Sequence, residues 1–354
     1  MQIPQLTFTR FIAALAVIIL HFGLFTWPFD TKIISQLANK STVAVSYFFL
    51  LSGFILVIAT FKNNVLTDTV ADIKNFWIKR AARILPLYLL SITIYFLFHF
   101  DYNPDIPLKW QIQSFIYSLF LIQTWNFPMA LDVNFPAWSL SVEAFLYFLF
   151  PWLYWQLNRC NTKKLMYVTI LFWAANTFVF KVLNESGAPH NFVYFFPMLH
   201  VATFIAGIAA GILFIRHYSF LSEKRTVLLS ITGIASIFLL YTAYKNWSFY
   251  GISHNGLLAP YFILIIYTLS VSKGKAISLL SSKPFVFMGD ISYAMYVFQV
   301  PVLEIALRYV PFFQGKETKE IFYYYLAVLI VVSIVMHICV EQPVRKGINK
   351  LLVR

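Results

Sequence analysis

The sequence predicts an all-α, polytopic membrane protein with about ten transmembrane helices, and two observations carry this prediction. Sixty per cent of the 354 residues are hydrophobic and only 12% are charged. That balance leaves too little polar surface for a water-soluble chain of this length. The hydrophobic residues also gather in segments of about 20, the number that a helix needs to cross the bilayer core.

Ten apolar segments have roughly this spanning length. A weaker segment, 110–125, is interrupted by glutamine and serine residues, so it could be an eleventh span or an interfacial helix. The first segment resembles the core of a signal peptide, but no convincing small-residue cleavage site follows it, and we interpret it as a retained helix. The ten segments cover residues 8–26, 43–61, 83–100, 138–157, 164–182, 197–215, 226–244, 257–272, 286–308 and 321–340.

The distribution of positive charge selects the topology. With a cytoplasmic N-terminus and with 110–125 outside the membrane core, 19 of the 27 lysine and arginine residues lie on the cytoplasmic side. Letting 110–125 cross would move the basic turns 159–164 and 216–225 outside, against the positive-inside rule. We therefore expect ten spans with both termini in the cytoplasm.

The chain is expected to form one transmembrane domain, residues 1–345, followed by a short basic cytoplasmic tail, 346–354. Residues 101–137 are the longest outer segment, and their aromatic content favours a folded cap on the outer membrane surface. The net charge of +13 does not indicate a nucleic-acid partner, because the basic residues fall at the ends of apolar segments. Cys160 and Cys339 have no metal-ligand spacing, and nothing else suggests a metal.

Arg10 and His21 lie in the first apolar segment. Eleven residues at about 100° each place them within roughly 20° of the same helix face, and about 16 Å apart along the axis. If Arg10 lies at the cytoplasmic edge of the membrane, His21 lies near its middle. An ionisable side chain there is energetically costly and usually has a functional or structural role. His21 is a candidate catalytic residue; the alternative is a histidine that only hydrogen-bonds a neighbouring helix.

Lys79, Arg80 and Arg83 open the third segment at its cytoplasmic end. Arg80 and Arg83 share one helix face, and guanidinium groups match phosphate oxygens in pairs. These residues are candidates for binding a phosphorylated ligand or cofactor. Anchoring of the helix by positive charge explains them equally well.

Glu143 lies about five residues, or roughly 7 Å, below the outer interface in the fourth segment. A carboxylate there suits a general base or a partner for an imidazolium, and the alternative is a structural salt bridge. Trp138, Ser139 and Ser141 precede it, and we expect them to contact substrate.

Tyr293, Tyr296 and Gln299 recur at intervals of three in the ninth segment and predict the border of a polar, substrate-binding cavity. Glu341 and Arg345 end the last span and predict a structural ion pair. His337, nearby, is intramembrane by this count and has no assigned role.

At these residues the chain resembles the acyltransferase-3 family of bacterial membrane O-acyltransferases. Each motif alone is weak, but six occur in the order of the family. They are Arg-x10-His (Arg10, His21), Phe-Phe-x-Leu-Ser-Gly-Phe (48–54), Arg-x-x-Arg-Ile-x-Pro-x-Tyr (80–88), Trp-Ser-Leu-Ser-x-Glu (138–143), Ile-Ser-Tyr-x-x-Tyr (291–296) and Glu-x-Pro-x-Arg (341–345).

The resemblance implies a multi-pass protein of the bacterial inner membrane. It would take an acyl group, commonly acetyl, from cytoplasmic acyl-coenzyme A and deliver it to a hydroxyl of an extracytoplasmic glycan or lipid-linked sugar. It implies His21 as the essential catalytic residue, Arg10, Arg80 and Arg83 on the coenzyme A side, and Glu143 on the acceptor side. Larger members add an extracytoplasmic hydrolase-like domain, for which a chain of this length is too short.

Two positions depart from the family. Ala144 stands where many members carry a second acidic residue, and Gln299 where many carry histidine. His21 could act as a general base on the acceptor or as a transient acyl carrier. The rival function is a transporter or flippase for a lipid-linked or polyanionic glycan, although the paired, broken half-repeats of many transporters are not found.

Overall fold

The computed structural model describes residues 3–63, 70–99, 106–245 and 253–353, and every regular element in these ranges is helical. The predicted all-α class is therefore confirmed. Residues 101–105 of the predicted cap and Arg354 of the predicted tail lie outside the described residues. The long helices are α1 (Gln5–Ile18), α3 (Val43–Asn63), α4 (Val70–His99), α6 (Trp138–Arg159), α7 (Thr162–Glu185), α9 (Val201–Arg216), α11 (Arg225–Tyr244), α13 (Ala259–Val271), α15 (Lys283–Tyr309) and α16 (Thr318–Met336).

Shorter helices and turns connect or extend these. Two single π-helical turns continue long helices, η1 after α1 and η6 between α16 and α17. The short elements are η1 (Ile19–Gly23), α2 (Lys32–Ala38), α5 (Leu108–Leu119), η2 (Phe127–Met129), η3 (Phe135–Ala137), α8 (His190–Phe195), η4 (Pro197–His200), α10 (Tyr218–Glu223), η5 (Ser253–Leu257), α14 (Lys275–Leu280), η6 (His337–Glu341) and α17 (Gln342–Leu352).

Eight helical segments among the described residues are long and apolar enough to cross a membrane. Two other predicted spans correspond to α6, which has 22 residues, and to α13, which has 13. A helix of 13 residues rises about 20 Å and is shorter than the bilayer core, so the count of ten and the side of the termini stay predictions. The eight segments are Gln5–Gly23, Val43–Phe61, Ala71–Phe98, Thr162–Glu185, Pro197–Arg216, Arg225–Tyr244, Lys283–Tyr309 and Thr318–Leu352.

The helices α3, α9 and α15 form the centre of the bundle, whereas α7 and α11 lie at its edge. Close approach of α3 and α9 depends on two glycines: a Cβ on Gly53 would lie 2.6 Å from the Phe204 carbonyl oxygen, and one on Gly207 would lie 2.1 Å from that of Leu50. Small residues that let backbones meet are typical of membrane helix contacts. Gly53 and Gly207 therefore allow the close packing of α3 and α9.

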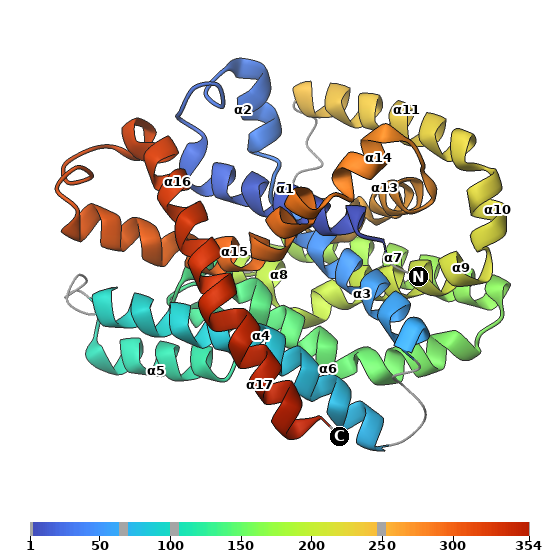
Figure 1. Cartoon of the computed structure of the whole chain (residues 1–354), viewed down its shortest axis with the longest axis horizontal. Helices are drawn as coiled ribbons and strands as arrows, with labels where there is room; N and C mark the ends of the chain where they lie inside the picture. The colour runs from blue at the N-terminus through green and yellow to red at the C-terminus, as the bar shows by residue number, and fades with distance from the viewer. Residues whose placement is uncertain (1–2, 64–69, 100–105, 246–252, 354) are drawn as a thin grey trace.

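The segment 106–137 packs into the bundle. In Figure 1, α5 lies beside α4, and the stacked rings of Phe96 and Phe115, 4.2 Å apart, join the two helices. With 12 residues, α5 rises about 18 Å and is too short to cross the membrane. The chain after it is held by buried side chains, because Asn134 Nδ2 donates to the Val297 carbonyl at 2.9 Å and Gln123 Nε2 to that of Ala137 at 3.2 Å.

The run α16–η6–α17 is one continuous helical rod, which crosses the front of the molecule in Figure 1 to the C-terminus and passes α4. The predicted boundary between domain and tail, after Arg345, falls inside α17. This rod brings the end of the chain against the first turns of α4, and it completes the wall of the cavity described next.

Candidate active site

A polar cavity of about 240 Å³ lies among α1, α3, α4, α6, α15 and the η6–α17 turn. Arginines from three helices line it: Arg10 from α1, Arg80 and Arg83, one turn apart, from α4, and Arg345 from α17. The first three belong to the predicted cofactor site, and the structure brings them together. Lys79, predicted with them, is not among the residues that line the cavity. The other polar side chains in the lining are Thr7, Ser52, Tyr147, Asp290, His337, Glu341 and Gln342.

The three predicted arginines carry positive charge without acidic partners in direct contact. Among the described residues, no carboxylate lies within 4 Å of Arg10, Arg80 or Arg83. The Arg80 Nε atom is buried and has no hydrogen-bond partner among them. Asp290 and Glu341 line the same cavity and Glu143 lies beside it, so acidic groups are near the three guanidinium groups but not in direct contact with them. Buried arginines without a direct carboxylate partner are typical of a binding site for an anion.

Glu143 lies beside this cavity. Its Oε1 atom accepts a hydrogen bond from Ser52 Oγ at 3.1 Å and a short one from the Tyr147 hydroxyl. Glu143, Ser52 and Arg10 all line a smaller hollow of about 40 Å³, and Ser52 and Arg10 also line the main cavity. The family resemblance implies a place for Glu143 on the acceptor side, and that role stays a prediction. In the structure its carboxylate lies next to the arginine-lined space.

Three of the predicted substrate-binding residues belong to the smaller hollow, and Gln299 lies outside its lining. Ser139, Tyr293 and Tyr296 line it. Ser139 Oγ and the Tyr296 hydroxyl lie 2.8 Å apart, and the Tyr296 hydroxyl also donates to the Pro136 carbonyl at 3.0 Å. These bonds tie α15 to the start of α6. Gln299 lies one turn beyond Tyr296 on α15 and is fully buried.

Trp138 and Ser141 line neither hollow. The Trp138 ring packs against Phe195 at 4.7 Å and against the rings of His200 and His254 at 5.6 and 5.5 Å. Ser141 Oγ donates to the Leu121 carbonyl at 2.6 Å. Both side chains therefore hold the start of α6 in place.

His21 occupies the π turn η1, beyond the arginine-lined cavity. Its Nδ1 atom lies 2.8 Å from Gln299 Oε1, while Gln299 Nε2 donates to the Tyr296 carbonyl at 2.8 Å. A carbonyl only accepts, so the amide nitrogen must face Tyr296 and the amide oxygen must face His21. His21 consequently carries its hydrogen on Nδ1, and its Nε2 atom keeps a free lone pair.

Aromatic rings surround His21. The His21 side chain is partly exposed, and its ring makes an edge-to-face contact with Phe135 at 4.7 Å. None of the described residues hydrogen-bonds Nε2. A neutral imidazole in this state can take a proton or attack an electrophilic carbon.

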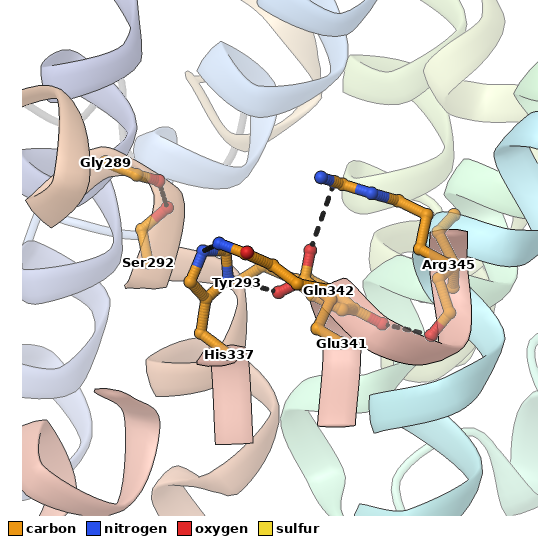
Figure 2. A network of polar contacts seen from close by, with 8 residues as sticks. Gly289, Ser292, Tyr293, His337, Glu341, Gln342 and Arg345 are labelled. Atoms are coloured by element: carbon orange, nitrogen blue, oxygen red, sulfur yellow. Dashed lines mark hydrogen bonds and ion pairs between the residues drawn. The ribbon is translucent and has the colours of Figure 1, made fainter. Parts of the chain in front are cut away.

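The η6 turn contributes a part of the cavity that sequence reasoning missed. Figure 2 shows His337 Nδ1 paired with Glu341 Oε2 at 2.7 Å, and Arg345 Nη1 reaching Glu341 Oε1 at 3.6 Å. The predicted Glu341–Arg345 ion pair is confirmed. His337 had no assigned role, although its spacing of four residues from Glu341 could have placed both on one helix face.

Comparison with known proteins identifies the family. The acyltransferase domain family has a model that matches residues 3–340, nearly the whole chain. The chain belongs to the acyltransferase-3 family. No solved structure is significantly similar to this one.

Three curated relatives illustrate what members of this family do. The chain is 25% identical to the peptidoglycan O-acetyltransferase OatA of Listeria monocytogenes over 98% of its own length and 56% of that protein. It is 21% identical to the O-acetyltransferase OatA of Staphylococcus aureus, over 97% of this chain and 57% of the relative. It is 29% identical to the acyltransferase MdmB of Streptomyces mycarofaciens, over 60% of this chain and 57% of that protein. The chain thus spans little more than half the length of the curated relatives it matches.

Proposed function

We propose that this acyltransferase moves an acetyl group from cytoplasmic acetyl-coenzyme A to a hydroxyl of an extracytoplasmic or lipid-linked glycan. The inner bacterial membrane is the site of the reaction. The observation that carries the proposal is the position of Arg10 and His21 on one helix. Arg10 faces the anion-binding cavity, and His21 lies about 16 Å further along the same axis. The names of the relatives, two of which are O-acetyltransferases, support acetyl as the group transferred.

The phosphates of the donor match the arginine-lined cavity, and its thioester matches His21. Arg10, Arg80 and Arg83 supply guanidinium groups for the donor phosphates. With the phosphates held there, the thioester arm extends along α1 and α15 towards His21. The smaller hollow beside Ser139, Glu143 and Tyr296 lies next to the cavity in this direction.

His21 Nε2 performs the chemistry in one of two ways. As a general base, it takes the proton from the acceptor hydroxyl while the oxygen attacks the thioester carbon; the carbon–sulfur bond breaks, and the imidazolium returns the proton to the thiolate. As an acyl carrier, Nε2 itself attacks the thioester carbon and expels the thiolate, which forms an Nε2–acyl bond. The acceptor oxygen then attacks the acyl carbon, the Nε2–carbon bond breaks to release the imidazole, and the hydroxyl proton passes to the thiolate. In both routes Gln299 stabilises the His21 tautomer that carries its hydrogen on Nδ1 and leaves Nε2 free to react.

An assay with purified protein in lipid nanodiscs tests the function. Acetyl-coenzyme A and a glycan acceptor are supplied, and free thiol and esterified glycan are measured together. We expect the two products in equal amounts. A transporter would release no thiol, so failure of thiol release with every acceptor would refute the proposal.

A further inference from the structure

The η6–α17 turn contributes to the wall of the same cavity that the three arginines line, and the proposed function does not use it. His337, Glu341, Gln342 and Arg345 all line the cavity from this side. His337 and Glu341 are each 3% exposed. A π-helical turn inside a long helix often marks a functional site, and η6 interrupts the rod at the point where it meets the cavity.

The hydrogen bonds in this wall fix the orientation of one amide. Gln342 Nε2 lies 2.8 Å from His337 Nε2, and His337 Nδ1 lies 2.7 Å from Glu341 Oε2. An amide nitrogen only donates, so His337 Nε2 accepts and the ring carries its hydrogen on Nδ1, which it donates to Glu341. Figure 2 shows this chain of contacts running from Gln342 through His337 to Glu341.

Within residues 3–63, 70–99, 106–245 and 253–353, the Gln342 amide makes no hydrogen bond besides the one to His337. One of its two amide hydrogens is bound to His337, which leaves the other hydrogen and the Oε1 atom for a ligand. A carboxamide that presents one donor beside one acceptor pairs with an adenine edge, accepting from the exocyclic amino group and donating to a ring nitrogen.

The distance between this turn and His21 indicates which part of the donor lies against it. Tyr325, on α16, donates to the carbonyl of Gln299, the partner of His21, at 2.8 Å. His337 lies 12 residues further along the same rod, or about 18 Å towards the other end. A donor whose thioester points to His21 therefore turns its nucleoside, the part furthest from the thioester, towards η6 and α17.

We propose that Gln342 reads the adenine of the acyl-coenzyme A donor, with His337 and Glu341 as positioning residues that hold its amide. This inference rests on the proposed function and adds the nucleoside subsite to it. The arginines on α1 and α4 bind phosphate, which is common to all nucleotides. Recognition of the base then falls to the uncharged amide of Gln342, since Glu341 is already paired with Arg345 and His337.

The test compares three acetyl donors in nanodiscs: acetyl-coenzyme A, its analogue with hypoxanthine in place of adenine, and S-acetyl-4′-phosphopantetheine, which has no nucleoside. The wild-type protein should prefer acetyl-coenzyme A to the hypoxanthine analogue by roughly tenfold in kcat/KM, since one paired amide discriminates by about that factor. Gln342→Ala should bring this ratio close to one and leave the rate with S-acetyl-4′-phosphopantetheine unchanged. His337→Leu should also lower the ratio of kcat/KM between acetyl-coenzyme A and the hypoxanthine analogue, because the Gln342 amide loses the ring that orients it.

Lys346→Ala is the matched control, because Lys346 is exposed on the same helix and does not line the cavity; it should keep the wild-type ratio. The inference is overturned if Gln342→Ala keeps the preference for adenine, or if it lowers the rate with all three donors equally. A wild-type protein that turns over none of them refutes the proposed function itself, an outcome distinct from a lost preference.

Discussion

His21 Nδ1 and Gln299 Oε1 lie 2.8 Å apart, and the second hydrogen bond of the amide, to the Tyr296 carbonyl, sets its direction. The family resemblance predicts histidine at the position of Gln299 in many members. In this chain the glutamine fixes the tautomer of His21 and directs the free nitrogen of the ring away from α15. The departure from the family pattern therefore has a physical consequence at the reacting group.

Replacing Gln299 should impair the chemical step more than donor binding. In Gln299→Leu the imidazole loses the acceptor for its Nδ1 hydrogen, and we expect kcat to fall by roughly 10- to 100-fold, the usual effect of losing an orienting partner. The KM for acetyl-coenzyme A should change little. Gln299→His, which restores the residue of many relatives, should recover most of the activity, and equal losses in both variants would contradict this role.

Arg80→Gln and Arg83→Gln should each raise the KM for acetyl-coenzyme A by about tenfold or more. A hydrogen bond to a charged group contributes about 1.5–3 kcal/mol, which corresponds to that change in affinity. Lys79→Gln is the control, because Lys79 precedes Arg80 in sequence but does not line the cavity. Initial rates over a donor titration at fixed acceptor measure this, and unchanged donor dependence in both arginine variants would count against the assignment.

Glu143→Gln should affect the donor and not the acceptor. The carboxylate lies beside the hollow that contains Arg10, where its negative charge opposes the binding of the donor phosphates. A glutamine can still accept hydrogen bonds from Ser52 and Tyr147, so the fold should persist and the KM for the donor should fall by about two- to threefold, as expected for loss of a partly screened charge. A change confined to the acceptor KM would instead support the acceptor-side role predicted from sequence.

Gly207→Ala should destabilise the bundle, because the added Cβ would lie 2.1 Å from the Leu50 carbonyl oxygen and force α3 and α9 apart. Overpacking of this kind costs about 1–3 kcal/mol. Gly233→Ala is a matched control on a peripheral helix, where nothing lies within 4 Å of the new Cβ. Thermal unfolding in detergent should show a lower Tm for the first variant and an unchanged or higher one for the second.

Much of the fold could be predicted from the sequence because hydrophobic segment length and positive charge are local properties. Each of the ten predicted spans corresponds to a helix, and the interrupted segment 110–125 forms the short helix α5. The full extent of α17 escaped this reasoning, because the basic stretch after Arg345 continues the helix without a break.

The site was predicted only in part, since tertiary contacts decide which residues meet. Arg10, Arg80 and Arg83 line one cavity, but the predicted start of the third span at residue 83 was too late: α4 begins at Val70, so Arg80 and Arg83 lie near the middle of the helix. Helix depth alone placed Glu143 opposite the arginines, but Ser52 and Tyr147 hold its carboxylate beside them. The cavity wall at His337 depends on how the last rod crosses α4, which no local pattern reveals.

The most direct test of the account is the rate of acetyl transfer after His21→Ala, with His217→Ala as a control at an exposed histidine on the turn between α9 and α10. Both variants are purified in nanodiscs and given saturating acetyl-coenzyme A and glycan acceptor. The account predicts that His21→Ala still binds the donor but forms no esterified glycan above background, while His217→Ala matches the wild type. Ester formation by His21→Ala at the wild-type rate would contradict it.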